Sequence, residues 1–147
     1  MPRRRQSLPR RALANLRAGR MQKALSAATA LSASAMGFEI YFEHYKGSFG
    51  DKWMWTPVLL TPPLTAAGIA GVFSERATKT ALPAVSALYC VDGLIGLVTH
   101  VQGIRKKPGG FSEPTYNLAM GPPLLAPGAL LAIGALGLLA PFMKRER

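Results

Sequence analysis

The sequence is poor in cysteine, histidine and acidic residues. The shortages of cysteine and histidine exclude several kinds of redox and metal site, and the shortage of acidic residues leaves the chain strongly basic. Its 147 residues include a single cysteine, Cys90. One cysteine excludes an internal disulfide, a CxxC redox pair and a zinc site built from several thiolates. The sequence also contains no HExxH metal motif, no phosphate-cradling glycine loop and no nucleophile beside a base. We therefore expect a protein that is not an enzyme on its own.

The few acidic residues leave a strong positive charge, and that charge is unevenly distributed. Seven acidic residues face 18 lysines and arginines, for a net charge of +11, yet 49% of the residues are apolar. Basic residues crowd the head, residues 1–23, and the tail, residues 143–147, and long segments with little charge lie between them. The head has no aromatic residues to stack on bases, which disfavours binding to nucleic acid. Basic residues that flank apolar segments are typical of membrane proteins.

Four segments are long and apolar enough to cross a bilayer, which takes about 20 residues as a helix. They cover residues 24–45, 55–74, 80–101 and 117–142. With both termini in the cytoplasm, all but five of the 18 basic residues lie on that side, the exceptions being Lys46, Lys52, Arg105, Lys106 and Lys107. The positive-inside rule therefore predicts an integral membrane protein, expected in a bacterial inner membrane, with cytoplasmic N- and C-termini.

A cleaved signal peptide is an alternative interpretation of the first apolar segment. Arg10-Arg11 resembles a twin-arginine signal, and Ala33-Ser34-Ala35 has the composition of a cleavage site. However, the arginine pair stands far from the apolar stretch, and the first segment is the counterpart of the third. We therefore favour a membrane span.

A pattern around the two outer loops is repeated. His44-Tyr45-Lys46-Gly47 matches His100-Val101-Gln102-Gly103, and Pro62-Pro63-Leu64 matches Pro122-Pro123-Leu124. Gly37 and Gly93 each stand seven residues before the histidine, which is about 10.5 Å of helix, and Gly68 matches Gly128. Each copy forms a helical hairpin with two spans, so both copies enter the membrane from the same side.

The fold predicted is an all-α membrane protein, a four-transmembrane-helix bundle built from two parallel helical-hairpin repeats. The repeats cover about residues 24–74 and 80–142, and the histidine-bearing spans lie diagonally opposite one another. Proline pairs break the second and fourth spans, at Pro62 and Pro63 and at Pro122 and Pro123. Such breaks are either kinks that shape packing or, in matching positions of two repeats, marks of a binding site.

Five ionisable residues within or at the ends of the first and third spans need an explanation: Glu39, Glu43, His44, Asp92 and His100. Such groups are costly in a membrane and are expected to face the interior of a bundle. Three interpretations remain open. The histidines are axial ligands of haem b or another tetrapyrrole, or the polar groups bind a metal or pass ions, or the histidines cap helix ends and the carboxylates pair with cations such as Lys46 and Arg105.

The first span, residues 24–37 above all, is rich in Ala, Ser and Thr, which indicates a helix that packs on protein. We expect a small integral subunit that anchors or completes a larger membrane complex, with a redox complex as the candidate and His44 and His100 as candidate haem ligands. Its partners would be the bilayer and other membrane or peripheral subunits. The alternative is a small oligomeric transporter, or an ion- or proton-conducting protein, that uses intramembrane carboxylates and proline-broken helices.

Overall fold

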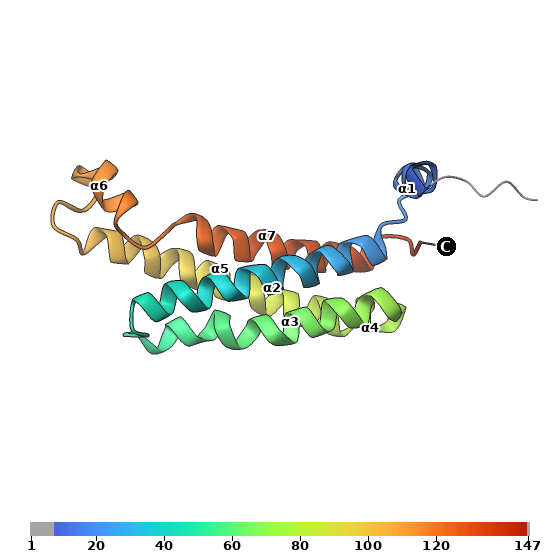
Figure 1. The fold of residues 1–147 in the computed structure, drawn as a ribbon, viewed down its shortest axis with the longest axis horizontal. Coiled ribbons are helices and arrows are strands. Elements are labelled where there is room, and N and C mark those ends of the chain that lie inside the picture. Colours follow the sequence, from blue (N-terminus) through green and yellow to red (C-terminus); the bar gives the residue numbers. More distant parts are fainter. Residues whose placement is uncertain (1–7, 147) are drawn as a thin grey trace, which may run out of the picture.

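The computed structural model describes residues 8–146 of the chain and is helical through most of that range (Figure 1). Arg3, Arg4, Arg5 and Arg147, which contribute to the predicted charge asymmetry, lie outside the described residues. The α-helices are α1 (Leu8–Arg17), α2 (Gln22–Lys46), α3 (Trp55–Phe73), α4 (Glu75–Lys79), α5 (Ala81–Arg105), α6 (Pro114–Ala119) and α7 (Leu125–Leu139). The 3-10 turns are η1 (Lys52–Met54), η2 (Gly110–Ser112) and η3 (Ala140–Phe142).

The four long helices α2, α3, α5 and α7 lie side by side. Helix α2 packs most extensively on α3, and α5 on α7, while further contacts join α3 to α5 and α2 to α7. Figure 1 shows α1, α4 and the C-terminal end together at one end of this group, and the 47–54 and 106–124 connections at the other. We call these the terminal end and the loop end. The prediction of an all-helical chain is confirmed for the described residues.

Three stretches of helix are long and apolar enough to cross a membrane: Lys52–Phe73, Glu75–Arg105 and Leu125–Phe142. Helix α2 is not among them, although its 25 residues make it as long as α5. Its many Ala, Ser and Thr residues, together with Glu39 and Glu43, lower its hydropathy. Four membrane spans were predicted. Three of them are apolar enough to cross a membrane, and α2 is less apolar than the other three.

The fourth apolar segment begins later than the sequence predicts. A helix from residue 117 was expected, but α6 ends at Ala119 and α7 begins at Leu125, with Pro122 and Pro123 in the connection. Proline has no backbone N–H to continue a helix and disfavours helical geometry in the residue before it, so the chain breaks there. Pro62 and Pro63, by contrast, lie inside α3, which runs through them, and both are exposed on its surface. The helix break expected at Pro62 and Pro63 therefore does not occur, whereas the chain does leave the helix at Pro122 and Pro123.

Small residues let paired helices approach closely. Between α2 and α3, a Cβ added to Gly68 would lie 2.8 Å from the backbone oxygen of Ser26. Between α5 and α7, a Cβ added to Gly134 would lie 2.9 Å from the backbone oxygen of Ser86. One turn further on, Gly71 and Gly137 pack against the same two serines. Such seams of glycine and serine are typical of helices that associate within membranes.

The glycine contacts correct one match that the sequence predicted between the two repeats. Gly128 was matched with Gly68, but a Cβ added to Gly128 would meet nothing within 4 Å. By its contacts, Gly134 rather than Gly128 corresponds to Gly68. The sequence match failed because it followed spacing from the proline pair, and α7 begins only after that pair whereas α3 runs through its own.

The core draws side chains from all four long helices. Apolar side chains that are fully inaccessible include Ala33, Leu64, Leu82 and Tyr89. Outward-facing leucines, isoleucines and valines such as Leu59, Ile69, Leu94 and Val98 remain more than half exposed. This arrangement leaves a broad apolar surface around the helices, as a lipid environment requires.

Replacing Gly134 with alanine should destabilise the fold, because the new Cβ would overlap the Cys90 sulfur and lie 2.9 Å from the Ser86 backbone oxygen. We expect a loss of about 1–3 kcal/mol, seen as a lower thermal midpoint in detergent. The matched control is Gly128→Ala on the same helix, which meets open space and should leave the midpoint unchanged or raise it. Equal effects of the two substitutions would contradict the proposed seam.

Candidate functional site

At the loop end, the second copy of the repeated motif forms a connected unit. The His100 ring lies on the backbone oxygen of Pro123, with its Nδ1 at 2.8 Å. Because a carbonyl oxygen only accepts hydrogen bonds, Nδ1 carries the proton. In the neutral ring, Nε2 is then the nitrogen without a proton. A Cβ added to Gly103 would lie 2.9 Å from the Pro122 ring, so the glycine provides the space that the proline occupies. His100 and Gly103 thus hold the start of α7 against α5.

The first copy does not reproduce these contacts. Nδ1 of His44 is buried and has no hydrogen-bond partner among the described residues, and its ring meets the edge of Phe49 at 6.2 Å between centroids. Gly47 ends α2 by donating its N–H to the Glu43 carbonyl at 3.3 Å. The expected equivalence of His44 and His100 therefore holds for their position near helix ends but not for their partners.

Polar side chains inside the helix group are paired between α3 and α5. Asp92, 7% exposed, accepts a hydrogen bond from the Thr56 hydroxyl. Thr61 donates to the Pro57 carbonyl at 2.7 Å, so the Tyr89 hydroxyl, 3.1 Å away, donates to Thr61. Asp92 also lies near enough to His44 for their charges to interact, as His100 does. Asp92 is the carboxylate that the interior encloses, as the sequence predicted for ionisable groups in these helices.

The two glutamates of α2 lie elsewhere. Glu39 is exposed, and Glu43, half-buried, forms an ion pair with Lys46 three residues later. The expectation that Glu39 faces the interior is wrong, because Ile40, its neighbour on the helix, takes the buried position. Glu39 instead is exposed beside a set of exposed aromatic side chains on the outward face of α2, namely Phe38, Tyr41, Phe42 and Tyr45, and at 100° per residue it stands about 60° from Phe42, on the side of Lys46. We call this set, with Glu39, the α2 outer face.

The arrangement gives little support to a cofactor or metal site. No group of three or more His, Cys, Asp or Glu residues that could hold a metal ion occurs among residues 8–146. The hydrogen bond of the His100 Nδ1 to the Pro123 carbonyl leaves Nε2 able to bind a metal, but the Nδ1 of His44 has no matching partner, and the buried carboxylate of Asp92 is unfavourable beside a haem.

A second polar structure, at the terminal end, was not predicted. Residues 143–146, which we call the tail clasp, contact the start of α2, the end of α3 and the segment between α1 and α2. The Glu146 carboxylate accepts hydrogen bonds from the backbone N–H groups of Lys23 and Ala24, at 2.7 and 2.9 Å, at the start of α2. The Arg145 guanidinium donates to the carbonyls of Gly71 and Val72, at 3.1 and 2.6 Å, at the end of α3.

The backbone of the clasp also pairs with the segment between α1 and α2. Lys144 donates its N–H to the Gly19 carbonyl at 2.9 Å and accepts from the Gln22 N–H at 3.3 Å, so that Lys144 and Arg20 form a parallel bridge. A carboxylate at a helix N-terminus and a guanidinium at a helix C-terminus each oppose the helix dipole and satisfy free backbone groups. From the sequence these residues were interpreted only as tail charges, because nothing local indicates contacts that lie between 73 and 125 positions away.

The pKa of Glu146 is lower than its ordinary value. Partial burial of the carboxylate alone would raise this pKa, but hydrogen bonds from the Lys23 and Ala24 backbone and the charge of Lys23 favour the ionised form and lower it overall. The carboxylate is therefore charged in the folded protein at neutral pH, as a helix cap requires.

Replacing Glu146 with glutamine should lower the free energy of unfolding by about 1 kcal/mol, because a neutral amide caps α2 less well. The folded-state pKa lies below the ordinary value of 4.5, so the stabilisation is complete above pH 4.5 and is lost as the pH falls through the folded-state pKa. Thermal midpoints of the wild type and Glu146→Gln should converge in acid. Glu113→Gln, at an exposed glutamate, is the control. A constant difference between wild type and variant at all pH values would contradict the cap.

Replacing His100 with alanine should loosen the 106–124 connection, since it removes the hydrogen bond to Pro123. We expect faster amide hydrogen exchange there, by about fivefold for a bond worth about 1 kcal/mol. His44→Ala, at the matching position of the first copy, should leave exchange in that connection unchanged. Equal acceleration by both variants would show that the His100 contact has no special role.

No family model matches this sequence. Neither a curated protein nor a solved structure matches it significantly. The functional proposals below therefore depend on the contacts, burial and charges of the chain itself.

Proposed function

We propose that this protein is a small integral membrane subunit whose helices α2, α3, α5 and α7 cross the bilayer and whose α2 outer face binds another membrane protein. In this proposal the chain anchors or completes a complex and carries out no chemical step alone. The observation that carries it is a set of exposed aromatic side chains with an exposed carboxylate, Glu39, beside it, on the least apolar of the four long helices.

The position of Glu39 argues for a protein neighbour. It lies seven residues, about 10 Å, before the last residue of α2. If α2 crosses the membrane, the charged form of an outward-facing glutamate is costly in lipid, by about 2.5–3.5 kcal/mol at the centre of a span and by less this close to its end. A hydrogen-bond donor or a cation on a neighbouring protein would remove this cost.

The rest of the α2 outer face has the composition of a protein interface. Phe38 is 71% exposed and Phe42 is 56% exposed, one turn apart along the helix. Aromatic side chains supply large contact areas at low entropic cost and are enriched where proteins bind one another. Outward positions on α3, α5 and α7, by contrast, are mainly aliphatic, as expected for helices that face lipid.

Two features support the finer architecture of this proposal, a four-helix bundle of two parallel hairpins. The α2–α3 and α5–α7 pairs each pack serine against two glycines spaced three residues apart. Helix α1, the tail clasp and the α4 turn lie at one end of the group (Figure 1). That end carries most of the basic residues, so we place it in the cytoplasm, and in the inner membrane if the source is bacterial.

An ion- or proton-conducting protein is the competing function. The buried Asp92 near His44 favours it, since a carboxylate inside membrane helices is a common part of proton paths. However, its hydrogen bond with Thr56 already accounts for Asp92 as a structural group, and the conducting function leaves the α2 outer face unexplained. A redox role would need a cofactor, and the two histidines lack the matching surroundings that a shared haem would require.

A photo-crosslinking amino acid at Phe38 should capture a partner polypeptide in native membranes, because this position faces outward on α2. Position 42 should give the same partner. The controls are Leu94 on α5 and Ile69 on α3, exposed at 54% and 51%, which should give lipid adducts instead. Mass spectrometry of the adducts identifies the product in each case.

The same experiment separates the alternatives. Lipid adducts alone at positions 38 and 42 would contradict the proposed interface. Adducts only to a second copy of this chain, together with proton flux in vesicles that is lost in Asp92→Asn, would favour the conducting protein.

A further inference from the structure

Helix α1, Leu8–Arg17, has an apolar face that no part of the described chain covers. Leu8, Leu13 and Leu16 are exposed at 81%, 48% and 53%, and α1 has no buried residue. At 100° per residue these leucines, with Ala12, fall within an arc of about 140°. Arg10, Arg11 and Arg17 lie on the remaining circumference, so α1 is a short basic amphipathic helix.

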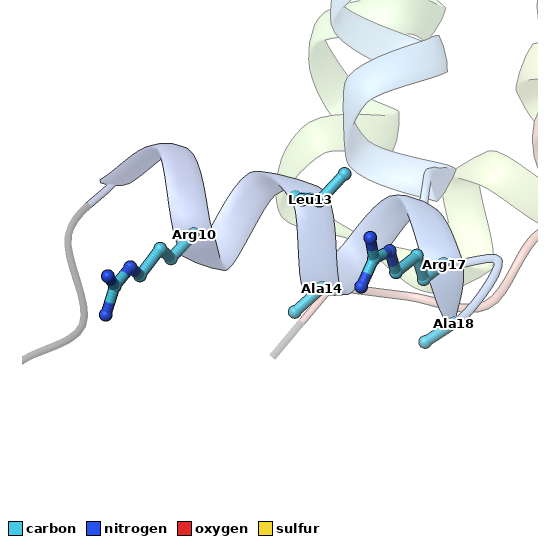
Figure 2. Close-up of a pocket in the computed structure, with 5 residues that line it drawn as sticks. All are labelled: Arg10, Leu13, Ala14, Arg17 and Ala18. Carbon is cyan, nitrogen blue, oxygen red and sulfur yellow. The ribbon is translucent and has the colours of Figure 1, made fainter.

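The direction of α1 differs from that of the long helices. In Figure 1 the long helices run across the picture and α1 is seen end-on, at the terminal end of the group. If the long helices cross a membrane, α1 therefore lies in the plane of its surface. Figure 2 shows Leu13 pointing to the side of α1 on which the long helices lie, whereas Ala14 and Ala18 point to the opposite side.

This direction is fixed by hydrogen bonds. Gly19 adopts a left-handed conformation, with φ of 64°, that ends α1. Its N–H bonds to the Leu16 carbonyl at 3.0 Å and the Arg20 N–H bonds to the Asn15 carbonyl at 2.8 Å, which is the Schellman pattern at a helix C-terminus. The tail clasp then holds this turn, because Lys144 donates to the Gly19 carbonyl.

The charge of this end indicates what covers the leucines. Arg10, Arg11 and Arg17 lie beside the apolar arc, and Arg20, Lys23 and Lys144 follow at the same end of the molecule. Helices with leucines on one face and arginines on the other lie in the interface of bilayers that contain anionic lipids. Each basic residue near such a surface is worth about 1 kcal/mol of attraction.

We propose that α1 docks on the anionic lipid surface around the terminal end, with its leucines among the acyl chains and its arginines among the headgroups. This inference depends on the proposed placement of the long helices across the membrane, but not on the partner bound by α2. Docked in this way, α1 would fix the depth of the bundle and leave Ala14 and Ala18 facing the cytoplasm.

The test uses the full chain with Cys90→Ala, reconstituted in vesicles of phosphatidylglycerol and phosphatidylcholine. An environment-sensitive dye is attached to a single cysteine at Leu13, Ala14 or Leu94. We expect nitroxide-bearing lipids to quench the dye at positions 13 and 94, and a water-soluble quencher to reach it at position 14. Replacing Arg10, Arg11 and Arg17 with glutamine should shift α1 toward the undocked state by about a hundredfold.

The outcomes distinguish this inference from the proposed function. A dye at position 94 that lipid does not quench would refute the membrane placement itself. Lipid quenching at position 94, with position 13 open to the water-soluble quencher, would refute only the docking of α1. A dye at position 13 shielded from both quenchers would also refute it, since protein rather than lipid would then cover the leucines.

Discussion

The close approach of helix backbones at the two glycine–serine seams is the constraint on which the rest of the structure depends. In lipid, apolar side chains gain little by leaving their surroundings, so helices associate through close packing and hydrogen bonds. Ser26 and Ser86 meet glycines where any Cβ would overlap them, and these contacts define the α2–α3 and α5–α7 pairs. Side-chain hydrogen bonds such as that between Tyr89 and Thr61 then join the pairs.

This packing determines which surfaces remain available for function. The seams use the Ala- and Ser-rich side of α2, so its aromatic residues and Glu39 are turned outward. A helix turned toward lipid would be expected to carry aliphatic residues there, as α5 does with Leu94 and Val98. This difference in composition is the basis of the proposal that the outer face of α2 binds protein. At the terminal end, the tail clasp fixes the direction of α1 relative to the helices that it joins.

Much of the fold was predictable from the sequence, because apolar segments of about 20 residues and the charges that flank them are local signals. The predicted and observed starts of α3 and α5 agree within a residue. The fourth segment was drawn from residue 117 by its hydropathy, although a break at Pro122 and Pro123 was expected, and α7 begins only after that break. The orientation of Glu39, the partner of His100 and the contacts of Glu146 depend on tertiary packing, and no spacing in the sequence encodes them. The signal for α1, leucines at 8, 13 and 16 between arginines, was present and was overlooked.

The central claim is that this chain is one subunit of a larger membrane complex. Native mass spectrometry of the protein released from its own membranes in a mild detergent tests it most directly. The account predicts a particle that contains the 15.7 kDa chain in fixed ratio with at least one different polypeptide, and that loses this polypeptide when Glu39 and Phe42 are both replaced by leucine. A particle whose mass is that of the chain alone, or a whole multiple of it, would contradict the account.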